Sequence, residues 1–152
     1  MISSTLGLFG MIGYTQYAPT KFAIRGLAES LRQELLPYGI RVHVYFVATI
    51  NSPGNETENM TKPTITKILE EGDLSDASPS NRAHVLIDGI ERGTFAVTSD
   101  WLTDAFRCAG KGAAPGSNYI LDFLLNIVGQ IVIPIWRRFA DWTVKSHHEN
   151  KK

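Results

Sequence analysis

The sequence has a single cysteine, no excess of charge of either sign and no Gly-x-Gly-x-x-Gly segment. The lone Cys108 excludes an internal disulfide and fits a reducing compartment, where we expect a small buried thiol. Fifteen basic residues balance fifteen acidic residues, so the charge does not favour a nucleic-acid partner. Without the glycine fingerprint, no segment predicts the turn that receives the pyrophosphate of a dinucleotide.

The chain nevertheless has the size and composition of a globular domain. Its 152 residues are enough for one hydrophobic core, and 43% hydrophobic and 20% charged residues are ordinary proportions. A strand needs about five residues, yet only Met1 to Ser3 precede the first functional candidate, Ser4. No secretory signal is visible. We therefore expect the sequence to be the second half of a longer protein.

Tyr17 and Lys21 lie four residues apart, just before an apolar segment that predicts a helix from Phe22 to Leu36. This spacing places both side chains on one helical face. The lysine ammonium can then stabilise a phenolate and bring the pKa of the tyrosine, ordinarily about 10, toward neutrality. Ser4 is separated from Tyr17 by a loop with glycines at positions 7, 10 and 13. Such a loop can fold back so that the serine and tyrosine hydroxyls hold one carbonyl oxygen.

Tyr-x-x-x-Lys alone is common by chance, and an exposed tyrosine and lysine on a helix is the alternative interpretation. The preceding Ile-Ser-Ser, the glycine spacing and the strand after the helix make this segment resemble the active-site segment of the short-chain dehydrogenase/reductase family. The resemblance implies that Ser4, Tyr17 and Lys21 are catalytic, and that Tyr17 and Lys21 also bind the cofactor. It implies an α/β fold, here the C-terminal half of a Rossmann-like doubly wound parallel sheet. No metal site is expected.

The rest of the chain predicts further elements of such a fold. A β-branched and aromatic run predicts a strand, and nearly continuous apolar character fits a parallel sheet covered on both faces. The expected elements are a strand over Ile40–Val47, a mobile substrate lid over Asn55–Pro79 with a helical piece at Ile65–Glu71, an amphipathic helix over Ser80–Arg92 and a last strand over Thr94–Thr98. A lid of this kind excludes water from an active site.

The family resemblance also implies a nicotinamide contact after the second strand. In the family this strand usually ends in Pro-Gly, and a threonine four residues after the glycine contacts the nicotinamide carboxamide. Here Val47 and Ala48 stand where Pro-Gly would be, and Ser52 stands at the threonine position. Ser52 keeps the hydroxyl, whereas the lost Pro-Gly changes the backbone next to the expected cofactor.

Within the family, the segment Lys21–Leu35 and the lid motifs Ser52-Pro-Gly, Glu58-Asn and Thr61-Lys-Pro look like those of 3-ketodihydrosphingosine reductases. This resemblance implies NADPH as cofactor and a long-chain sphingoid base as substrate. It also implies residence on the endoplasmic reticulum membrane, with the active site facing the cytosol. The alternatives are a reductase of another lipid, a steroid or a retinoid, or a catalytically silent chain that serves as an interaction module.

The segment from Tyr119 to Trp136 contains 18 mostly apolar residues and an internal Pro134, which predicts a kink. A spanning helix needs about 20 apolar residues, and the polar stripe Asp122, Asn126 and Gln130 disfavours a lone span. A helix lying in the membrane interface, or a hairpin that enters one leaflet, fits better, with Arg137, Arg138 and Lys145 near anionic headgroups. The alternative is a buried C-terminal helix of a soluble domain.

The expected organisation is therefore a reductase part at 1–115, a membrane-associating tail at 116–145 and a polar C-terminus at 146–152. In the resembling family the helix after the Tyr-x-x-x-Lys motif forms much of a subunit interface, which implies a dimer or tetramer. The alternative is a helix that packs only on its own sheet.

Overall fold

The computed structural model describes residues 1–70 and 78–149, and these build an α/β fold around a three-stranded parallel sheet. The strands are β1 (Ile2–Ser4), β2 (Val44–Val47) and β3 (Ala96–Thr98), in the order β1-β2-β3. Ile2 pairs with Tyr45, and Val44 pairs with Ala96. The central strand is buried, as its apolar sequence predicted.

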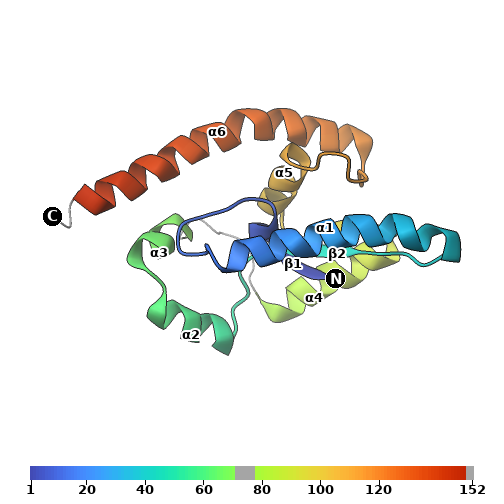
Figure 1. Ribbon diagram of the computed structural model, residues 1–152, viewed down its shortest axis with the longest axis horizontal. Helices are drawn as coiled ribbons and strands as arrows, with labels where there is room; N and C mark the ends of the chain where they lie inside the picture. The colour runs from blue at the N-terminus through green and yellow to red at the C-terminus, as the bar shows by residue number, and fades with distance from the viewer. Residues whose placement is uncertain (71–77, 150–152) are drawn as a thin grey trace.

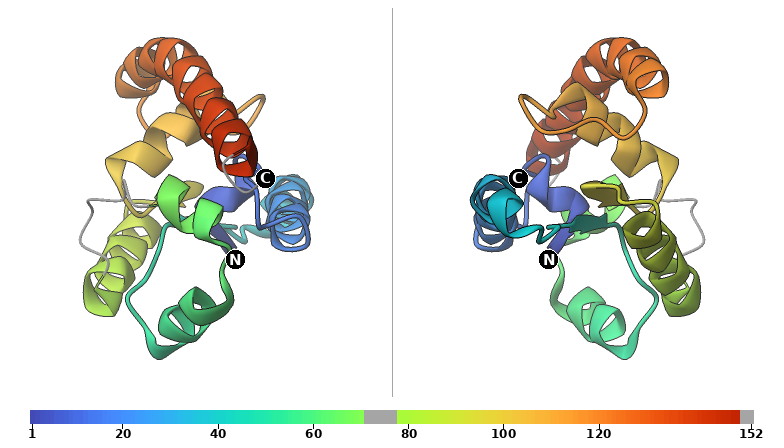
Figure 2. Two further views of the ribbon diagram at one scale, coloured as in Figure 1. Left: turned by 90° about the vertical axis from the view of Figure 1, so that its left-hand side faces the viewer. Right: turned by 90° about the vertical axis from the view of Figure 1, so that its right-hand side faces the viewer.

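Helices cover both faces of this sheet (Figure 2). In chain order they are the short 3-10 helix η1 (Thr5–Gly7), α1 (Tyr17–Leu35), the 3-10 helix η2 (Leu36–Tyr38), α2 (Pro53–Thr61), α3 (Thr64–Glu70), α4 (Pro79–Glu91), α5 (Trp101–Ala109) and α6 (Tyr119–Glu149). Helix α1 lies on one face and α4 on the other, while α5 and α6 lie above one end of the sheet (Figures 1 and 2). The core cluster joins α1 to the strands through Ala28, Val44, Phe46 and Ala96.

The predicted elements are present, but several of their bounds differ. Helix α1 begins at Tyr17 rather than Phe22, so Pro19 lies in its first turn, where a proline is tolerated. The second strand is only Val44–Val47. Part of the expected lid forms α2, because the Ser52 hydroxyl accepts a hydrogen bond from Asn55 N and Pro53 begins the helix. The helical piece expected at Ile65–Glu71 is α3 (Thr64–Glu70), and residues 71–77 of the lid lie outside the described residues.

Helix α5 was not predicted. Its signal is the N-cap Asp100, whose carboxylate accepts hydrogen bonds from Thr103 N at 2.8 Å and from the Thr103 hydroxyl at 3.1 Å. The helix is short, and its pattern is hard to recognise because Trp101 and Leu102 are exposed while the polar Thr103 and Arg107 are buried. Burial raises the pKa of the Cys108 thiol to about 11, which fits the inert buried thiol expected from the sequence.

Helices α1 and α4 pack against the sheet through small residues. Their larger apolar side chains, which the sequence pattern suggested would face the sheet, are partly exposed. Leu27 of α1 and Ile87 of α4 are each 51% exposed, whereas Ala28 and Gly89 face the sheet. A Cβ atom on Gly89 would lie 2.5 Å from Val97 Cγ2. The small residues therefore let each helix approach the strands closely.

This packing predicts opposite effects of two glycine-to-alanine changes. Gly89→Ala is expected to destabilise the chain by about 1–3 kcal/mol through overpacking against Val97. Gly26→Ala, in an open position of α1, is expected to stabilise it by about 0.5–1 kcal/mol, since alanine favours helix. Urea unfolding of both variants measures this difference, and equal shifts would contradict it.

Helix α6 is the longest element, and it continues through Pro134 as one arched helix (Figure 1). Among the described residues, it alone is long and apolar enough to cross a membrane, judged by length and composition. Only 11% of its most apolar 18-residue window is buried. Its outward face carries apolar side chains at a spacing of four, namely Phe123, Ile127, Ile131 and Ile135.

The polar stripe of α6 contacts α5, with Asp122 buried and Gln130 still exposed. Asp122 is 2% exposed, with Oδ1 2.7 Å from Arg107 Nη2 and Oδ2 3.3 Å from Lys111 Nζ. Gln130 donates to the Ala109 carbonyl at 3.2 Å. The Asp122 charge, which made a lone spanning helix unfavourable, is therefore neutralised inside the protein, and the outward face of α6 is left apolar.

Candidate active site

The structure brings Tyr17 and Lys21 together in the first two turns of α1. Lys21 Nζ lies 5.2 Å from the centroid of the Tyr17 ring, close enough for the ammonium to interact with it. Tyr17 is 41% exposed, and within the described part of the chain its hydroxyl makes no hydrogen bond. The phenol is thus accessible to a bound molecule and has a cation beside it.

Ser4 is the last residue of β1, and its Oγ accepts a hydrogen bond from Leu6 N at 3.2 Å. Among the described residues no hydrogen bond joins Ser4 to Tyr17. The connection runs instead through Ser3, a residue that sequence reasoning missed. Ser3 is 1% exposed, and its hydroxyl donates to the Lys21 carbonyl at 2.9 Å. The Ser-Ser pair therefore has two functions: one serine fixes α1 to β1, and the next presents its side chain at the strand end.

The loop of residues 5–16, called the Gly-rich loop below, is held from the opposite side by α5 and α6. The Phe9 ring stacks on Phe106 with centroids 4.3 Å apart, and it meets Trp136 edge-on at 5.2 Å. Both terminal nitrogens of Arg137 donate to the Gly10 carbonyl at 3.2 Å. The segment between Ser4 and Tyr17 thus depends on α6 for its position, which the sequence did not indicate.

The backbone after β2 is held by Ser99, which follows β3, and by Arg82 of α4. Ala48 N donates to Ser99 Oγ at 2.9 Å, and the buried Arg82 donates to the Ser99 carbonyl at 2.8 Å. Arg82 also reaches the Thr49 carbonyl at 3.4 Å. These bonds hold the chain where the usual Pro-Gly is absent. Ser52 follows this stretch, and its oxygen caps α2 while its hydroxyl hydrogen stays available to donate.

A groove of about 290 Å³ lies between the Gly-rich loop, α3 and α6. Met11, Ile12 and Leu69 form its apolar part. Arg137, Asp141 and Lys145 of α6 supply its charged residues. This groove therefore joins the loop that precedes Tyr17 to the helix with the exposed apolar face.

Comparison with known proteins gives consistent matches. The short chain dehydrogenase family model matches residues 1–63. The chain is 38% identical over 145 residues to a 3-ketodihydrosphingosine reductase of Cryptococcus neoformans, covering 95% of this chain and 43% of the relative. It is 40% identical over 127 residues to that of Neurospora crassa, covering 82% of this chain and 35% of the relative. It is 37% identical over 131 residues to that of Dictyostelium discoideum, covering 86% and 39% respectively.

The chain thus spans about two-fifths of the length of these curated relatives. No solved structure matches it. The comparisons confirm the resemblance that the Ser4, Tyr17 and Lys21 spacing predicted: the chain is similar to short-chain dehydrogenases and, among them, to 3-ketodihydrosphingosine reductases.

Proposed function

We propose that this chain, similar over residues 1–63 to the short chain dehydrogenase family, is the C-terminal part of a 3-ketodihydrosphingosine reductase. On this proposal, residues 1–115 form the second half of a Rossmann-like doubly wound sheet. Residues 116–145 form a membrane-associating tail, and residues 146–152 a polar C-terminus. The observation that carries the proposal is Tyr17 with Lys21 beside it at the first turn of α1, following Ser4 at the end of β1.

The residues present fit one end of a nicotinamide cofactor. Lys21 can hold the ribose hydroxyls beside Tyr17, and Ser52 has a hydrogen free to donate to the carboxamide. The glycine turn that would receive the pyrophosphate is not in this sequence, so that end of the cofactor needs another segment. NADPH is the cofactor proposed from the reductase resemblance.

The proposed reaction reduces the C3 ketone of a long-chain sphingoid base to a secondary alcohol. Bound NADPH supplies the hydride. Tyr17 donates its phenolic proton to the oxygen that becomes the alkoxide, and the Lys21 ammonium stabilises the negative charge left on the phenol. Ser4 donates a hydrogen bond to the same substrate oxygen. The exposed Tyr17 hydroxyl, free of internal partners among the described residues, supports this role.

The substrate is tested in an extended protein, defined as this chain joined to the preceding N-terminal part of the Cryptococcus neoformans reductase. We expect NADPH oxidation with 3-ketodihydrosphingosine at a kcat/KM at least about 100-fold above that with steroid or retinal substrates, since buried contacts to the correct substrate give such ratios. A preference for a steroid or retinoid would favour the alternative reductase.

The alternative to an enzyme is a catalytically silent chain that serves as an interaction module. Fluorescence titration of NADPH into the 152-residue chain shows whether this polypeptide binds the cofactor or is silent. Saturable binding at micromolar concentration means that the chain completes a cofactor site, either alone or as an oligomer through α1. A folded chain that does not bind is a module whose chemistry requires the longer protein.

The apolar face of α6 supports association with a membrane surface, here proposed to be that of the endoplasmic reticulum with the active site toward the cytosol. The helix would lie in the interface, because its polar stripe is engaged by α5. Arg138 and Lys145 are exposed and can meet anionic headgroups.

Flotation with vesicles tests this orientation. Ile131→Asp is expected to reduce binding to phosphatidylcholine–phosphatidylserine vesicles by about tenfold or more, since a charged residue in the apolar region costs about 2.5 kcal/mol. Ile87→Asp is the matched control, an isoleucine on α4 that is 51% exposed, against 60% for Ile131. Equal binding of the two variants would contradict the proposed membrane face.

A further inference from the structure

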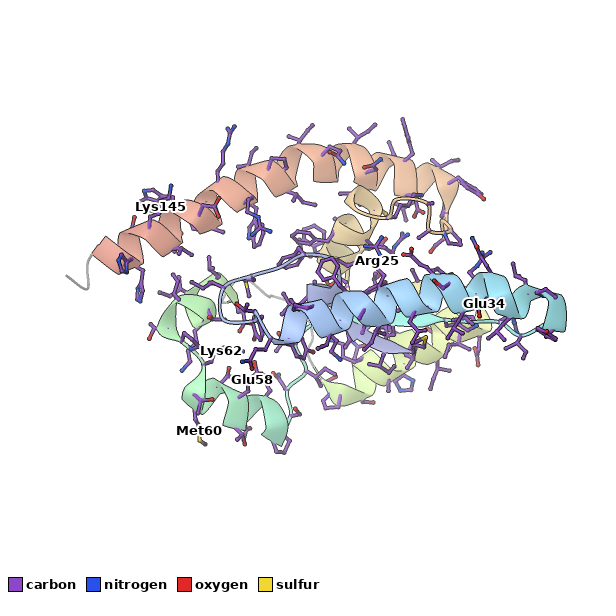
Figure 3. All side chains as sticks on the ribbon, viewed as in Figure 1. Arg25, Glu34, Glu58, Met60, Lys62 and Lys145 are labelled. Carbon is purple, nitrogen blue, oxygen red and sulfur yellow. The ribbon has the colours of Figure 1, made fainter. Side chains whose placement is uncertain are left out.

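Four residues from three separate segments meet beside the start of α1 and form what we call the polar cluster: Tyr14, Glu58, Lys62 and Glu70. The Tyr14 hydroxyl lies 2.8 Å from Glu58 Oε1 and 2.6 Å from Glu70 Oε1. Lys62 Nζ lies 3.0 Å from Glu58 Oε1 and 2.7 Å from Glu70 Oε2. Figure 3 shows Glu58 and Lys62 close together near the N-terminal end of α1.

The cluster connects α2 and α3 to the residue three positions before Tyr17. Glu58 lies in α2, Lys62 caps its C-terminus, and Glu70 is the last residue of α3. Tyr14 belongs to the Gly-rich loop, its carbonyl accepts from Ala18 N at 2.8 Å, and its ring lies 5.7 Å from that of Tyr17. A displacement of the two-helix segment (residues 53–70) therefore acts directly on the turn that carries Tyr17.

Lys62 is the essential cation of this arrangement. Its side chain is 6% exposed and stands between two carboxylates, with its Nζ 5.6 Å from the Tyr14 ring centroid. Burial lowers the pKa of Lys62, but Glu70 and Glu58 outweigh that effect and raise it above its ordinary value. Without this ammonium, two carboxylates would share one tyrosine hydroxyl and repel each other.

A second contact holds the same two surfaces together. Thr66 of α3 is 1% exposed, and its hydroxyl donates to the Ile12 carbonyl at 3.2 Å. Gly13 has a φ of 89°, and a Cβ there would collide with Thr66 Oγ1. Glycine is therefore required by both the backbone conformation and the close approach. The Gly-rich loop is thus shaped to receive α3.

We propose that Tyr14, Lys62, Glu58 and Glu70 are positioning residues that hold the two-helix segment closed against the Gly-rich loop and so keep Tyr17 in place for the reaction. This inference rests on the proposed reductase function for its catalytic consequence, but the closed contact itself does not. The cluster would open and close as a unit, because each of its charged members depends on the others for neutralisation.

Hydrogen exchange of the 152-residue chain tests the contact without any need for turnover. Lys62→Met is expected to accelerate exchange of the α2 and α3 amides by about tenfold or more, while the sheet amides are unchanged, since hydrogen bonds to charged groups contribute about 1.5–3 kcal/mol. Tyr14→Phe should act in the same direction, and Lys62→Arg should restore part of the protection.

The matched controls are Lys67→Met, on α3 outside the cluster, and Tyr38→Phe, a tyrosine that is 76% exposed. The proposal is overturned if Lys62→Met exchanges like Lys67→Met, or if its faster exchange spreads equally over α1 and the sheet. Additive effects in the Tyr14→Phe and Lys62→Met double variant would also overturn it, because a single cluster requires coupling between them.

Kinetics of the extended protein then test the positioning role. Tyr14→Phe and Lys62→Met are expected to lower kcat by several-fold, because a displaced Tyr17 donates its proton less efficiently, and to raise KM for the sphingoid ketone. Lys62→Arg should recover most of that loss, whereas Tyr38→Phe leaves both constants unchanged. Variants with faster amide exchange in α2 and α3 but unchanged KM and kcat would overturn the positioning role. An extended protein that shows no turnover at all, with the exchange pattern as predicted, would instead reject the proposed function and leave the closed contact intact.

Discussion

Tyr17→Phe in the extended protein is expected to lower kcat by about a hundred- to ten-thousand-fold, the range ordinarily contributed by a positioned proton donor. Phenylalanine keeps the ring beside Lys21 but removes the phenolic hydroxyl that donates the proton in the proposed reaction. NADPH affinity should change little, because the ring and the lysine stay in place. Stopped-flow measurement of NADPH oxidation, combined with a fluorescence titration, separates the two effects.

Tyr38→Phe is the control for this change, since Tyr38 is an exposed tyrosine remote from Lys21 in the sequence and is 76% accessible. It should leave kcat and NADPH affinity at the wild-type values. Turnover retained by Tyr17→Phe at a level near that of Tyr38→Phe would reject Tyr17 as the proton donor.

Asp122→Ala is expected to have the largest effect on stability. Breaking a buried ion pair by removing one partner costs about 3–5 kcal/mol, and we expect the lower end because Arg107 keeps Asp104 at 2.6 Å. The change should release the N-terminal part of α6 from α5. Urea unfolding followed by tryptophan fluorescence measures it, since Trp136 contacts Phe106 of α5.

Asp141→Ala, on the same helix but exposed, should shift the free energy of unfolding by no more than about 0.5 kcal/mol.

The pH dependence of the free energy of unfolding provides an independent check. Burial raises the pKa of Asp122, but Arg107 and Lys111 outweigh this and hold that pKa at about 2. The pair's contribution is therefore complete above about pH 4 and is lost as the pH falls toward 2. A wild-type chain that loses no more stability than Asp122→Ala over this interval would contradict the assignment.

The short-range chemistry of the site was visible in the sequence because it is encoded by spacing. A separation of four on one helix fixes the Tyr17–Lys21 pair without any tertiary information, and the structure brings these side chains together. Apolar and β-branched runs likewise marked the central strand and the last strand. Ser4, Tyr17, Lys21 and Ser52 keep their functional assignments as predictions, and the kinetic test above addresses that of Tyr17.

Contacts between distant segments could not be predicted, because no local pattern specifies them. Arg137 and Gly10 are 127 residues apart, yet they fix the Gly-rich loop. The partner of the stripe at Asp122 and Gln130 also could not be predicted, since a polar row on an apolar helix does not reveal whether water, lipid or another helix faces it. The stripe faces the buried guanidinium of Arg107, and this contact depends on the position of α5.

The central claim is hydride transfer from NADPH to the C3 carbonyl of a sphingoid base by a site containing Ser4, Tyr17 and Lys21. Its most direct test supplies the extended protein with NADPH deuterated at the transferred position of nicotinamide C4, together with 3-ketodihydrosphingosine, and analyses the product by mass spectrometry. The account predicts dihydrosphingosine with one deuterium on C3, formed by the wild-type protein and not by Tyr17→Phe. Absence of that labelled alcohol from a folded, NADPH-binding protein would contradict it.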